Sequence, residues 1–460
     1  MAMVNCLPPE VLVKVLSFRR DNRDLISATH VCERWRSTLL STPLLWTEVD
    51  FKDPDRAITY LGRSKDAPLH VSIGCSKLDS STGDMSWIDR TNSLCINGDQ
   101  GYIESIVGQL CLSAPLLQSL TFNAPPGPKD WRTVGHLIRI PPDFLAQQVP
   151  SLRNLAFLSV SPSPVTNIPL QHLTNLEWTD SFVVIEELFA ILESATLLEA
   201  ITLNFRRVPM PGAEPTRVIT LRKLRKLVWD IGGLFSLPRF LNTPELEELK
   251  IYINYSHMNS GPSIILPPHR EHVPLLAEPT ALKYACHNLA RKWYFTYTSG
   301  RLIISESPDI LIMDPPPDRW LSPSTPISFR NTKQLVLEGF GGYPLPSNIP
   351  IEQFESLESL KLVGEVGRLL EILQPNGNAI SGVLVPLLSH LELHSALPAR
   401  DIPFEVLTEI LRERKEVGYG VKTVRIVGEY EKCPSEMASV LTELVDVLIL
   451  AHTPAYTAED

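Results

Sequence analysis

The stretch that sets the fold is "PLLQSLTF", residues 115–122. Its end, Leu120-Thr121-Phe122, alternates apolar and polar side chains, as a β-strand with one buried face does. Leu117 precedes this strand, where an apolar side chain turns in from the preceding bend. One such strand cannot bury its apolar face alone. We therefore expect it to stack on neighbours of the same kind.

The same phrase, apolar-x-x-apolar-x-apolar, returns along the chain at intervals of roughly 20 to 35 residues, which is the range of leucine-rich repeats. We find it at residues 115–122, 150–157, 172–178, 196–203, 223–229, 244–251, 332–337, 356–362, 387–393 and 420–426, with a weaker copy at 90–96. Helices are expected on return legs at 184–195, 367–374 and 404–418. The asparagine that commonly ends the leucine-rich phrase is mostly missing, so the predicted repeat is irregular.

The residue between the last two apolar positions should point out of the core, towards the concave side of a solenoid. These residues are Thr121, Ala156, Glu177, Thr202, Val228, Lys250, Val336, Lys361, Glu392 and Arg425. Cations gather in the later repeats, which favours a protein substrate with acidic or phosphorylated patches. Lys250, Lys361, Glu392 and Arg425 are therefore the candidate substrate-binding residues. The plain alternative is a solvated sheet face.

Two segments depart from the repeat. Residues 254–330 read as an insertion, with a poor repeat copy and two short strands joined at Ser299-Gly300. A long insertion in a solenoid often emerges at the binding face, although a merely irregular repeat with long linkers is equally expected. Residues 434–451 are predicted to form an amphipathic helix that caps the last repeat, and a partner-binding helix is the alternative.

Composition excludes some classes of function. The chain has 460 residues, 44% hydrophobic and 20% charged, which predicts a folded protein with several domains or one elongated architecture. Its net charge of −10 argues against nucleic acid as a partner. The seven scattered cysteines favour reduced thiols in the cytoplasm or nucleus. We see no signal peptide, and Glu443 and Asp446 interrupt the most apolar late segment, so no membrane span is expected.

No catalytic motif is visible. The phosphate-binding, nucleophile-elbow, dinucleotide and zinc-protease patterns are missing from the sequence. His390 and His394 are four residues apart and would share one side of a strand, but two histidines make a weak metal site. We expect no enzyme activity, cofactor or metal. An unrecognised active site is the remaining alternative.

The first fifty residues carry apolar stripes at helical spacing. Three short helices are predicted between the prolines at 8–9 and Pro43. A unit of this size buries too little surface to stand alone. Its apolar stripes are also wider than packing among the three helices requires. Part of this surface should therefore dock on something else, either the following domain or a second protein.

This segment resembles an F-box in four landmarks that occur in order. They are "LPPEVL" (7–12), Asp24-Leu25, "VCERWR" (31–36) and "PLLW" (43–46). The resemblance implies a helical module that docks on the adaptor Skp1, and through it on a cullin, in SCF-type ubiquitin ligases. The contact or framework residues that it implies are Leu7, Pro8, Leu12, Leu16, Leu25, Val31, Cys32 and Trp35.

The whole chain resembles F-box proteins with divergent leucine-rich repeats, a style seen in fungal genomes. The expected fold is α/β, with a small three-helix F-box at 5–50, a connecting segment at 51–80 and an irregular leucine-rich-repeat solenoid at 81–433 that has a parallel sheet on its concave face. The expected function is substrate recognition for an SCF-type ligase, with ubiquitin transfer left to the partner enzyme. A scaffold that triggers no degradation is the alternative.

Overall fold

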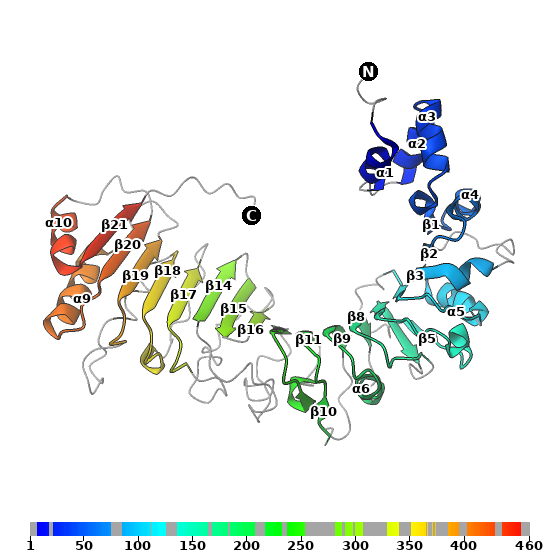
Figure 1. Ribbon diagram of the computed structural model, residues 1–460. Helices are drawn as coiled ribbons and strands as arrows, with labels where there is room; N and C mark the ends of the chain where they lie inside the picture. The colour runs from blue at the N-terminus through cyan, green and yellow to red at the C-terminus, as the bar shows by residue number, and fades with distance from the viewer. Residues whose placement is uncertain are drawn as a thin grey trace. The chain divides into compact units, whose positions relative to one another are not determined.

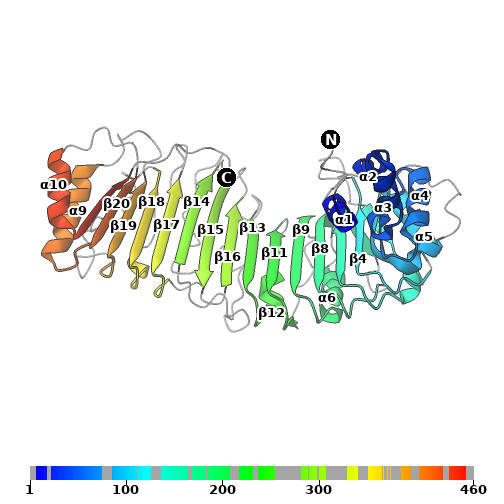
Figure 2. The same cartoon turned by 45° about the horizontal axis from the view of Figure 1, so that its top comes forward.

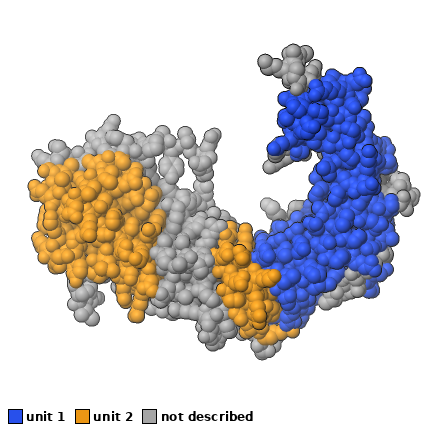
Figure 3. Space-filling model, viewed as in Figure 1, with its two compact units in different colours: residues 1–211 blue, residues 212–460 orange. Residues whose placement is uncertain are grey.

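The computed structural model (Figure 1) divides the chain into two compact units, residues 1–211 and 212–460 (Figure 3). The structure describes residues 7–17, 22–74, 85–110, 112–125, 136–163, 168–182, 185–207, 217–231, 237–253, 281–287, 290–297, 300–306, 329–339, 351–364, 366, 370, 373, 385–394, 403–427 and 435–451.

Unit 1 begins with a helical head. Its elements are α1 (Pro9–Ser17), α2 (Asn22–Thr29), α3 (Glu33–Leu40) and the 3-10 helix η2 (Pro43–Trp46). Helices α1 and α2 both contact α3, and α1 also contacts η2. Leu12, Leu16 and Leu25 are buried in this head. The three predicted helices are confirmed.

A parallel sheet follows in the same unit, and Figure 2 shows its strands side by side. The strand order is β1-β2-β3-β4-β6-β8-β9. The strands are β1 (Glu48–Asp50), β2 (Leu69–Ile73), β3 (Thr91–Asn97), β4 (Ser119–Asn123), β6 (Asn154–Leu158), β8 (Asn175–Phe182) and β9 (Ala200–Arg207). The apolar positions of successive copies pair in register, for example Leu120 with Leu155 and Leu155 with Leu176.

Aromatic side chains continue through the core behind this sheet. Phe122, Phe157, Trp178 and Phe205 follow one another with ring centroids 5.4–5.5 Å apart. Each ring is almost fully buried, at 0–1% exposed. The indole N–H of Trp178 donates to the carbonyl oxygen of Val160 at 3.0 Å, so its polar atom is satisfied. The repeated phrase thus builds a continuous core across neighbouring strands.

Helices fill several return legs of unit 1. They are α4 (Pro54–Ser64), α5 (Gln100–Gln109) and α6 (Ile185–Ser194), with the 3-10 helices η4 (Ser86–Arg90) and η5 (Phe144–Gln147). Asp53 and Asp99 cap α4 and α5 by accepting from backbone N–H groups of Arg56 and Tyr102. A small parallel sheet pairs β5 (His136–Arg139) with β7 (Val160–Ser163).

The predicted connecting segment 51–80 needs correction. It holds α4 and β2, and β1 pairs with β2 in parallel, so the sheet begins at Glu48 instead of after residue 80. Alternation in "LHVSI" (69–73) is the same one-sided strand pattern as in the later copies, with Leu69, Val71 and Ile73 buried. The head therefore continues directly into the sheet.

The main strands of unit 2 follow the order β11-β13-β16-β15-β14-β17-β18-β19-β20-β21. The strands are β11 (Lys226–Ile231), β13 (Glu248–Ile253), β14 (Ala281–His287), β15 (Ala290–Tyr297), β16 (Gly300–Glu306), β17 (Gln334–Gly339), β18 (Ser359–Val363), β19 (His390–His394), β20 (Thr423–Val427) and β21 (Val447–Ala451). Its other elements are β10 (Ile219–Thr220), which pairs with β12 (Leu241–Asn242), η7 (Leu237–Phe240), η13 (Ile351–Gln353), α9 (Phe404–Glu416) and α10 (Ser435–Leu444).

The predicted insertion 254–330 does not interrupt this sheet. Strand β16 pairs in parallel with β13, β14 pairs in parallel with β17, and β15 runs antiparallel between β14 and β16. The two predicted strands on either side of Ser299 are confirmed as β15 and β16, and the predicted poor copy supplies β14. Because β15 pairs with both β14 and β16, the strand ladder continues through this segment.

The predicted helix at 434–451 is wrong in its second half. Helix α10 ends at Leu444, and residues 447–451 form β21, which pairs in parallel with β20. Residues 447–451, "VLILA", form a strand because their backbone can pair with β20 at the end of the strand ladder. The N–H of Val447 donates to the carbonyl oxygen of Lys422 at 2.9 Å. Leu441 in α10 is fully buried, whereas Leu450 is 44% exposed.

Each of the ten clear copies of the phrase contains part of a β-strand. The expected helices at 184–195 and 404–418 are confirmed as α6 and α9. The helix expected at 367–374 lies almost wholly outside the described residues. The chain is therefore a mixed α/β protein with a helical head and largely parallel sheets.

Candidate functional site

The head leaves several large apolar side chains exposed. Val11 and Val15 are 41% and 48% exposed, one turn apart on α1. Val31 is 58% exposed in the turn before α3, and Leu40 and Leu44 are 37% and 69% exposed at the end of α3 and in η2. These five residues are called the exposed apolar set below. Elements this small rarely expose so much apolar area without a partner.

The residues implied by the resemblance divide into two groups. Leu12, Leu16 and Leu25 are only 3–8% exposed, so they pack inside the head. Pro8 and Val31 are exposed, and Leu7, Cys32 and Trp35 are half-buried. The sequence interpretation missed Val11, Val15, Leu40 and Leu44 as surface candidates. On α1, the pair Val11/Val15 neighbours the buried pair Leu12/Leu16, and both pairs have the same helical spacing.

Hydrogen bonds connect the ends of the head. The guanidinium of Arg34 in α3 donates to the carbonyl oxygen of Leu7 at 2.9 Å. Arg36 donates in the same way to Thr29, the last residue of α2, at 2.9 Å. Both arginines belong to the "VCERWR" landmark. These two arginines therefore tie Leu7 and the end of α2 to α3. The exposed apolar side chains of α1 stay available to a partner.

Trp46 anchors the head to the sheet. Its side chain is fully buried, and its indole N–H donates to the carbonyl oxygen of Leu39 at 2.9 Å. On its other side lies α4, where the ring of Tyr60 meets it edge-on at 4.9 Å and the guanidinium of Arg63 lies 4.4 Å above it. One residue of the closing "PLLW" landmark thus packs against both α3 and the first return helix of the sheet.

Comparison with known proteins identifies the class of this head. Residues 4–52 match the F-box-like family, which supports an F-box protein. A search of curated proteins finds no match. Within the part of the chain that the structure describes, no helix is both long and apolar enough to cross a membrane.

Three of the predicted substrate-binding residues meet on the outer face of unit 2. Lys361, Glu392 and Arg425 pair in register on β18, β19 and β20. The ammonium of Lys361 and the guanidinium of Arg425 each lie 3.5 Å from the same carboxylate oxygen of Glu392. The ring of His394 also contacts this oxygen. One carboxylate thus offsets one of the two positive charges.

The pKa of Glu392 reflects these contacts. Burial acts to raise the pKa, but the hydrogen bond with His394 and the charges of Lys361 and Arg425 outweigh it, so the pKa lies below its ordinary value. Glu392 therefore stays ionised at neutral pH. A phosphate approaching this cluster would meet a carboxylate as well as two cations, which weakens the predicted preference for acidic partners.

Lys250 does not join this cluster. It lies on β13, and four strands separate β13 from β18 in the sheet, which is a separation of about 24 Å at the usual strand spacing. Its ammonium lies 3.0 Å from the carboxylate of Glu248, and Lys226 lies 3.7 Å from the same carboxylate. The four predicted residues therefore share one face without forming one site.

The histidine pair shows no sign of a metal site. His390 and His394 lie at the two ends of β19, with Glu392 between them on the same face. The ring of His390 hydrogen-bonds to the hydroxyl of Ser389 at 2.7 Å. Among the residues with described placement, no group of three or more His, Cys, Asp or Glu side chains is arranged to hold a metal ion.

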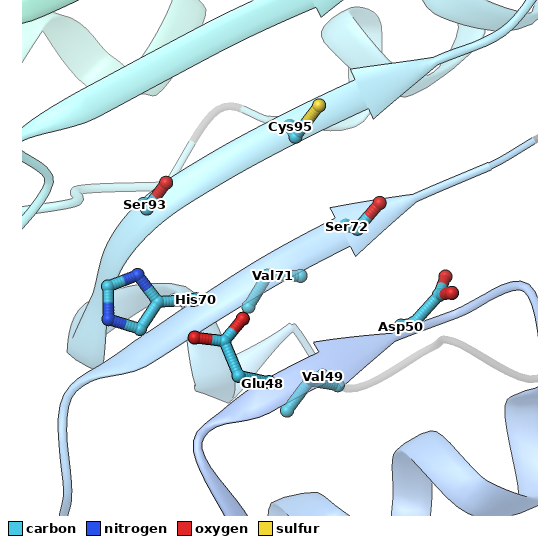
Figure 4. A pocket seen from close by; sticks show the side chains of 8 residues that line it. All are labelled: Glu48, Val49, Asp50, His70, Val71, Ser72, Ser93 and Cys95. Atoms are coloured by element: carbon cyan, nitrogen blue, oxygen red, sulfur yellow. The ribbon is translucent and has the colours of Figure 1, made fainter. Parts of the chain in front are cut away.

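A shallow pocket lies on the outer face of unit 1, next to the head (Figure 4). Its lining comes from β1, β2 and β3 and consists of Glu48, Val49, Asp50, His70, Val71, Ser72, Ser93 and Cys95. Cys95 is a free thiol; burial raises its pKa more than the hydrogen bond to Asn97 lowers it. The thiol is therefore protonated and poorly nucleophilic at neutral pH. The sequence interpretation did not identify this pocket.

Proposed function

We propose that this protein is the substrate-recognition subunit of an SCF-type ubiquitin ligase, with a head that binds a Skp1-like adaptor and through it a cullin. F-box domains bind Skp1, and residues 4–52 match that family. The observation that carries the proposal is the exposed apolar set of the head. Trp46, which anchors the head to the sheet, is by contrast buried against α4. An adaptor that covered these side chains would remove apolar area from water at about 25 cal/mol per Å².

We further propose that the sheets belong to an irregular leucine-rich-repeat solenoid that holds a protein substrate. The in-register pairing of successive copies supports this, since each copy buries its apolar row only against its neighbours. Such a subunit positions its target and needs no catalytic group or cofactor of its own. Its partners would place it in the cytoplasm or nucleus.

Capture of the full chain by an immobilised, purified Skp1-type adaptor tests the proposal. We expect the wild-type protein to be retained and the double variant Val15→Asp/Leu44→Asp to be lost, because each carboxylate would be desolvated in the interface. Ile58→Asp is the matched control: Ile58 is 60% exposed, but it lies on α4, outside the head. Failure of the wild-type protein to bind, or equal loss in the control, would overturn the proposal.

A cellular measurement separates a receptor from a non-degradative scaffold. If the chain is a receptor, its deletion should raise the level of at least one protein, and a copy carrying Val15→Asp/Leu44→Asp should not restore that level. A scaffold would leave protein levels unchanged.

A further inference from the structure

Strand β21 is the last strand of the unit 2 ladder (Figure 1). Among the described residues it pairs with β20 alone, in continuous parallel register from Val447 to Ala451. Helix α10 contacts it and buries Leu441 and Val445 just before the strand begins. The side of β21 that faces away from β20 is called the β21 edge below.

The core row of unit 2 becomes exposed at this strand. On β19 and β20 the side chains of this row are at most 2% exposed, because the strands on both sides cover them; they are Leu391, Leu393, Val424 and Ile426. Leu448 and Leu450 continue the row on β21, in register with Val424 and Ile426. Yet Leu450 is 44% exposed and Leu448 is half-buried. On the outer face of the same strand, Val447 and Ile449 are 47% and 41% exposed.

Nothing in the sequence of β21 protects the edge from pairing. Natural sheets guard an open edge with Lys, Pro, a bulge or an inward-pointing charge. The strand "VLILA" (447–451) contains neither Pro nor a charged residue, and its pairing with β20 shows no bulge. Both faces of the strand are apolar. The edge therefore suits another extended segment that is apolar on both of its faces.

The backbone groups that are open to such a partner follow from one hydrogen bond. The N–H of Val447 donates to the carbonyl oxygen of Lys422 at 2.9 Å, so the backbone groups of Val447 point towards β20. Successive residues of a strand point their N–H and C=O groups to opposite sides. The N–H and C=O groups of Leu448 and Leu450 therefore point out from the β21 edge.

A second copy of β21 meets this requirement with a particular register. If two copies pair antiparallel about a two-fold axis at Ile449, Leu448 of each copy lies opposite Leu450 of the other. These two pairs exchange four backbone hydrogen bonds, and Ile449 faces its own counterpart in a pair without hydrogen bonds. The axis runs perpendicular to the sheet, so the two core rows join into one and the exposed part of Leu450 is covered.

Charge favours the same arrangement. Asp446 precedes the strand and is exposed. In the two-fold register the two Asp446 residues lie at opposite ends of the pair, three residues from the axis on either side. That is a separation of about 20 Å along the strands, more than twice the screening length at physiological salt. Shifting the axis by one residue to Leu448 would place Asp446 directly opposite Leu450, where a carboxylate would lose water.

We propose that two copies of this chain associate through the β21 edge, as an antiparallel strand pair about a two-fold axis at Ile449. Each copy has one such edge and the pairing uses both, so association ends at a dimer. The contact is smaller than a standard protein interface, so the dimer should be weak. Under the proposed function such a dimer presents two adaptor-binding heads, but the association itself needs no adaptor.

Sedimentation velocity of the full chain, without adaptor, tests the association. Between about 1 and 100 μM we expect the wild-type protein to shift from monomer to dimer, as a weak interface requires. Ile449→Lys should weaken the dimer at least tenfold, because two like charges would then lie directly opposite each other. A wild-type protein that stays monomeric, or that forms larger species in place of a dimer, would overturn the proposal.

A charge swap tests the register. Ile449→Glu alone should also weaken the dimer, less than Ile449→Lys does, since Arg425 lies beside this position on β20. An equimolar mixture of the two variants should form a heterodimer, because position 449 faces itself and the opposite charges then pair. Recovery in the mixture also shows that both variants are folded. If mixing them restores no dimer, the two-fold pairing at Ile449 is refuted.

Val218→Lys is the matched control. Val218 is 47% exposed, similar to Ile449, and it lies before β10, outside the β21 edge. This variant should dimerise as the wild-type protein does, and an equal loss in Val218→Lys and Ile449→Lys would contradict the assignment of the interface. Adaptor capture is measured on the same proteins. Dimerisation without adaptor capture would refute only the proposed function, whereas adaptor capture by a strictly monomeric chain would refute only this inference.

Discussion

The indole ring of Trp46 meets the phenol ring of Tyr60 edge to face, with ring centroids 4.9 Å apart. Trp46 closes the F-box-like head, and Tyr60 belongs to α4, the first return helix of the sheet. Both side chains are at most 1% exposed. Because η2 leads within two residues into β1, the head is joined to the sheet by packing and by the chain itself.

Removal of the anchor should therefore destabilise unit 1. Trp46→Ala removes the ring contact and the hydrogen bond to Leu39, and we expect a loss of about 3–5 kcal/mol in the free energy of unfolding. Leu44→Ala, two residues away in the same 3-10 helix, should cost less than about 0.5 kcal/mol because Leu44 is 69% exposed. Urea unfolding followed by tryptophan fluorescence and circular dichroism measures both. Similar losses of unfolding free energy in the two variants would refute the claim that Trp46 anchors the head to the sheet.

Adjacent residues of α1 should have opposite roles. Leu12 is 3% exposed and Val11 is 41% exposed. We expect Leu12→Ala to lower the free energy of unfolding by about 2–5 kcal/mol and Val11→Ala by less than about 0.5 kcal/mol. Val11→Ala should instead weaken adaptor binding, measured by titration calorimetry on the folded protein. If Val11→Ala leaves the adaptor affinity unchanged while destabilising the fold, the division between framework and contact residues is wrong.

The Glu392 cluster predicts a pH-dependent stability difference. The pKa of Glu392 is lower in the folded protein than its ordinary value of 4.5, so its stabilising contribution is present above about pH 4.5 and is lost as the pH falls through the folded pKa. Glu392→Gln should lower stability at pH 7 by up to about 1 kcal/mol, since the group is partly exposed. The difference from wild type should shrink below about pH 4.5.

Urea unfolding at pH 7 and pH 3.5 measures this difference. Glu355→Gln is the control, because the Glu355–Arg330 pair is exposed on both sides and should contribute little at either pH. A difference between wild type and Glu392→Gln that stays constant from pH 7 to pH 3.5 would show that the carboxylate charge plays no part.

The C-terminal helix and strand should also respond differently to truncation. Leu441 of α10 is fully buried, and Leu450 of β21 is 44% exposed. Leu441→Ala should cost about 2–5 kcal/mol, and Leu450→Ala should cost clearly less because no large cavity forms. Thermal unfolding of the two variants, compared under identical conditions, gives the order. If Leu450→Ala costs more than Leu441→Ala, the buried contacts at this end of unit 2 are made by β21 and not by α10.

Strands were the most predictable feature of this chain. Alternation in phrases such as "PSLRNLAF" (150–157) determines which side chains are buried, and stacking then determines the parallel register. Local patterns do not determine the partner of a strand. For this reason the sequence of 254–330 favours an insertion, although the segment supplies β14, β15 and β16. "VLILA" (447–451) is ambiguous for the same reason, since a short apolar run fits a helix or a strand until pairing decides.

The candidate site was predictable only in part. The F-box landmarks indicated the head, but Leu16, which the resemblance implied as a contact or framework residue, is buried, while Val15 beside it is exposed. One stripe of α1 contains both kinds of residue, and only packing against α3 separates them. The pairing of Lys361 and Arg425 with Glu392 also depends on strand register, which the sequence does not state.

Amide hydrogen exchange of the full chain, with and without a saturating Skp1-type adaptor, tests the central claim most directly. If the exposed apolar set is the docking surface, adaptor binding should slow exchange in residues 9–17 and 33–46 and leave β18–β20 unchanged. Slowed exchange confined to the sheets, or no change anywhere at saturating adaptor, would contradict the assignment of the head as an adaptor-binding module.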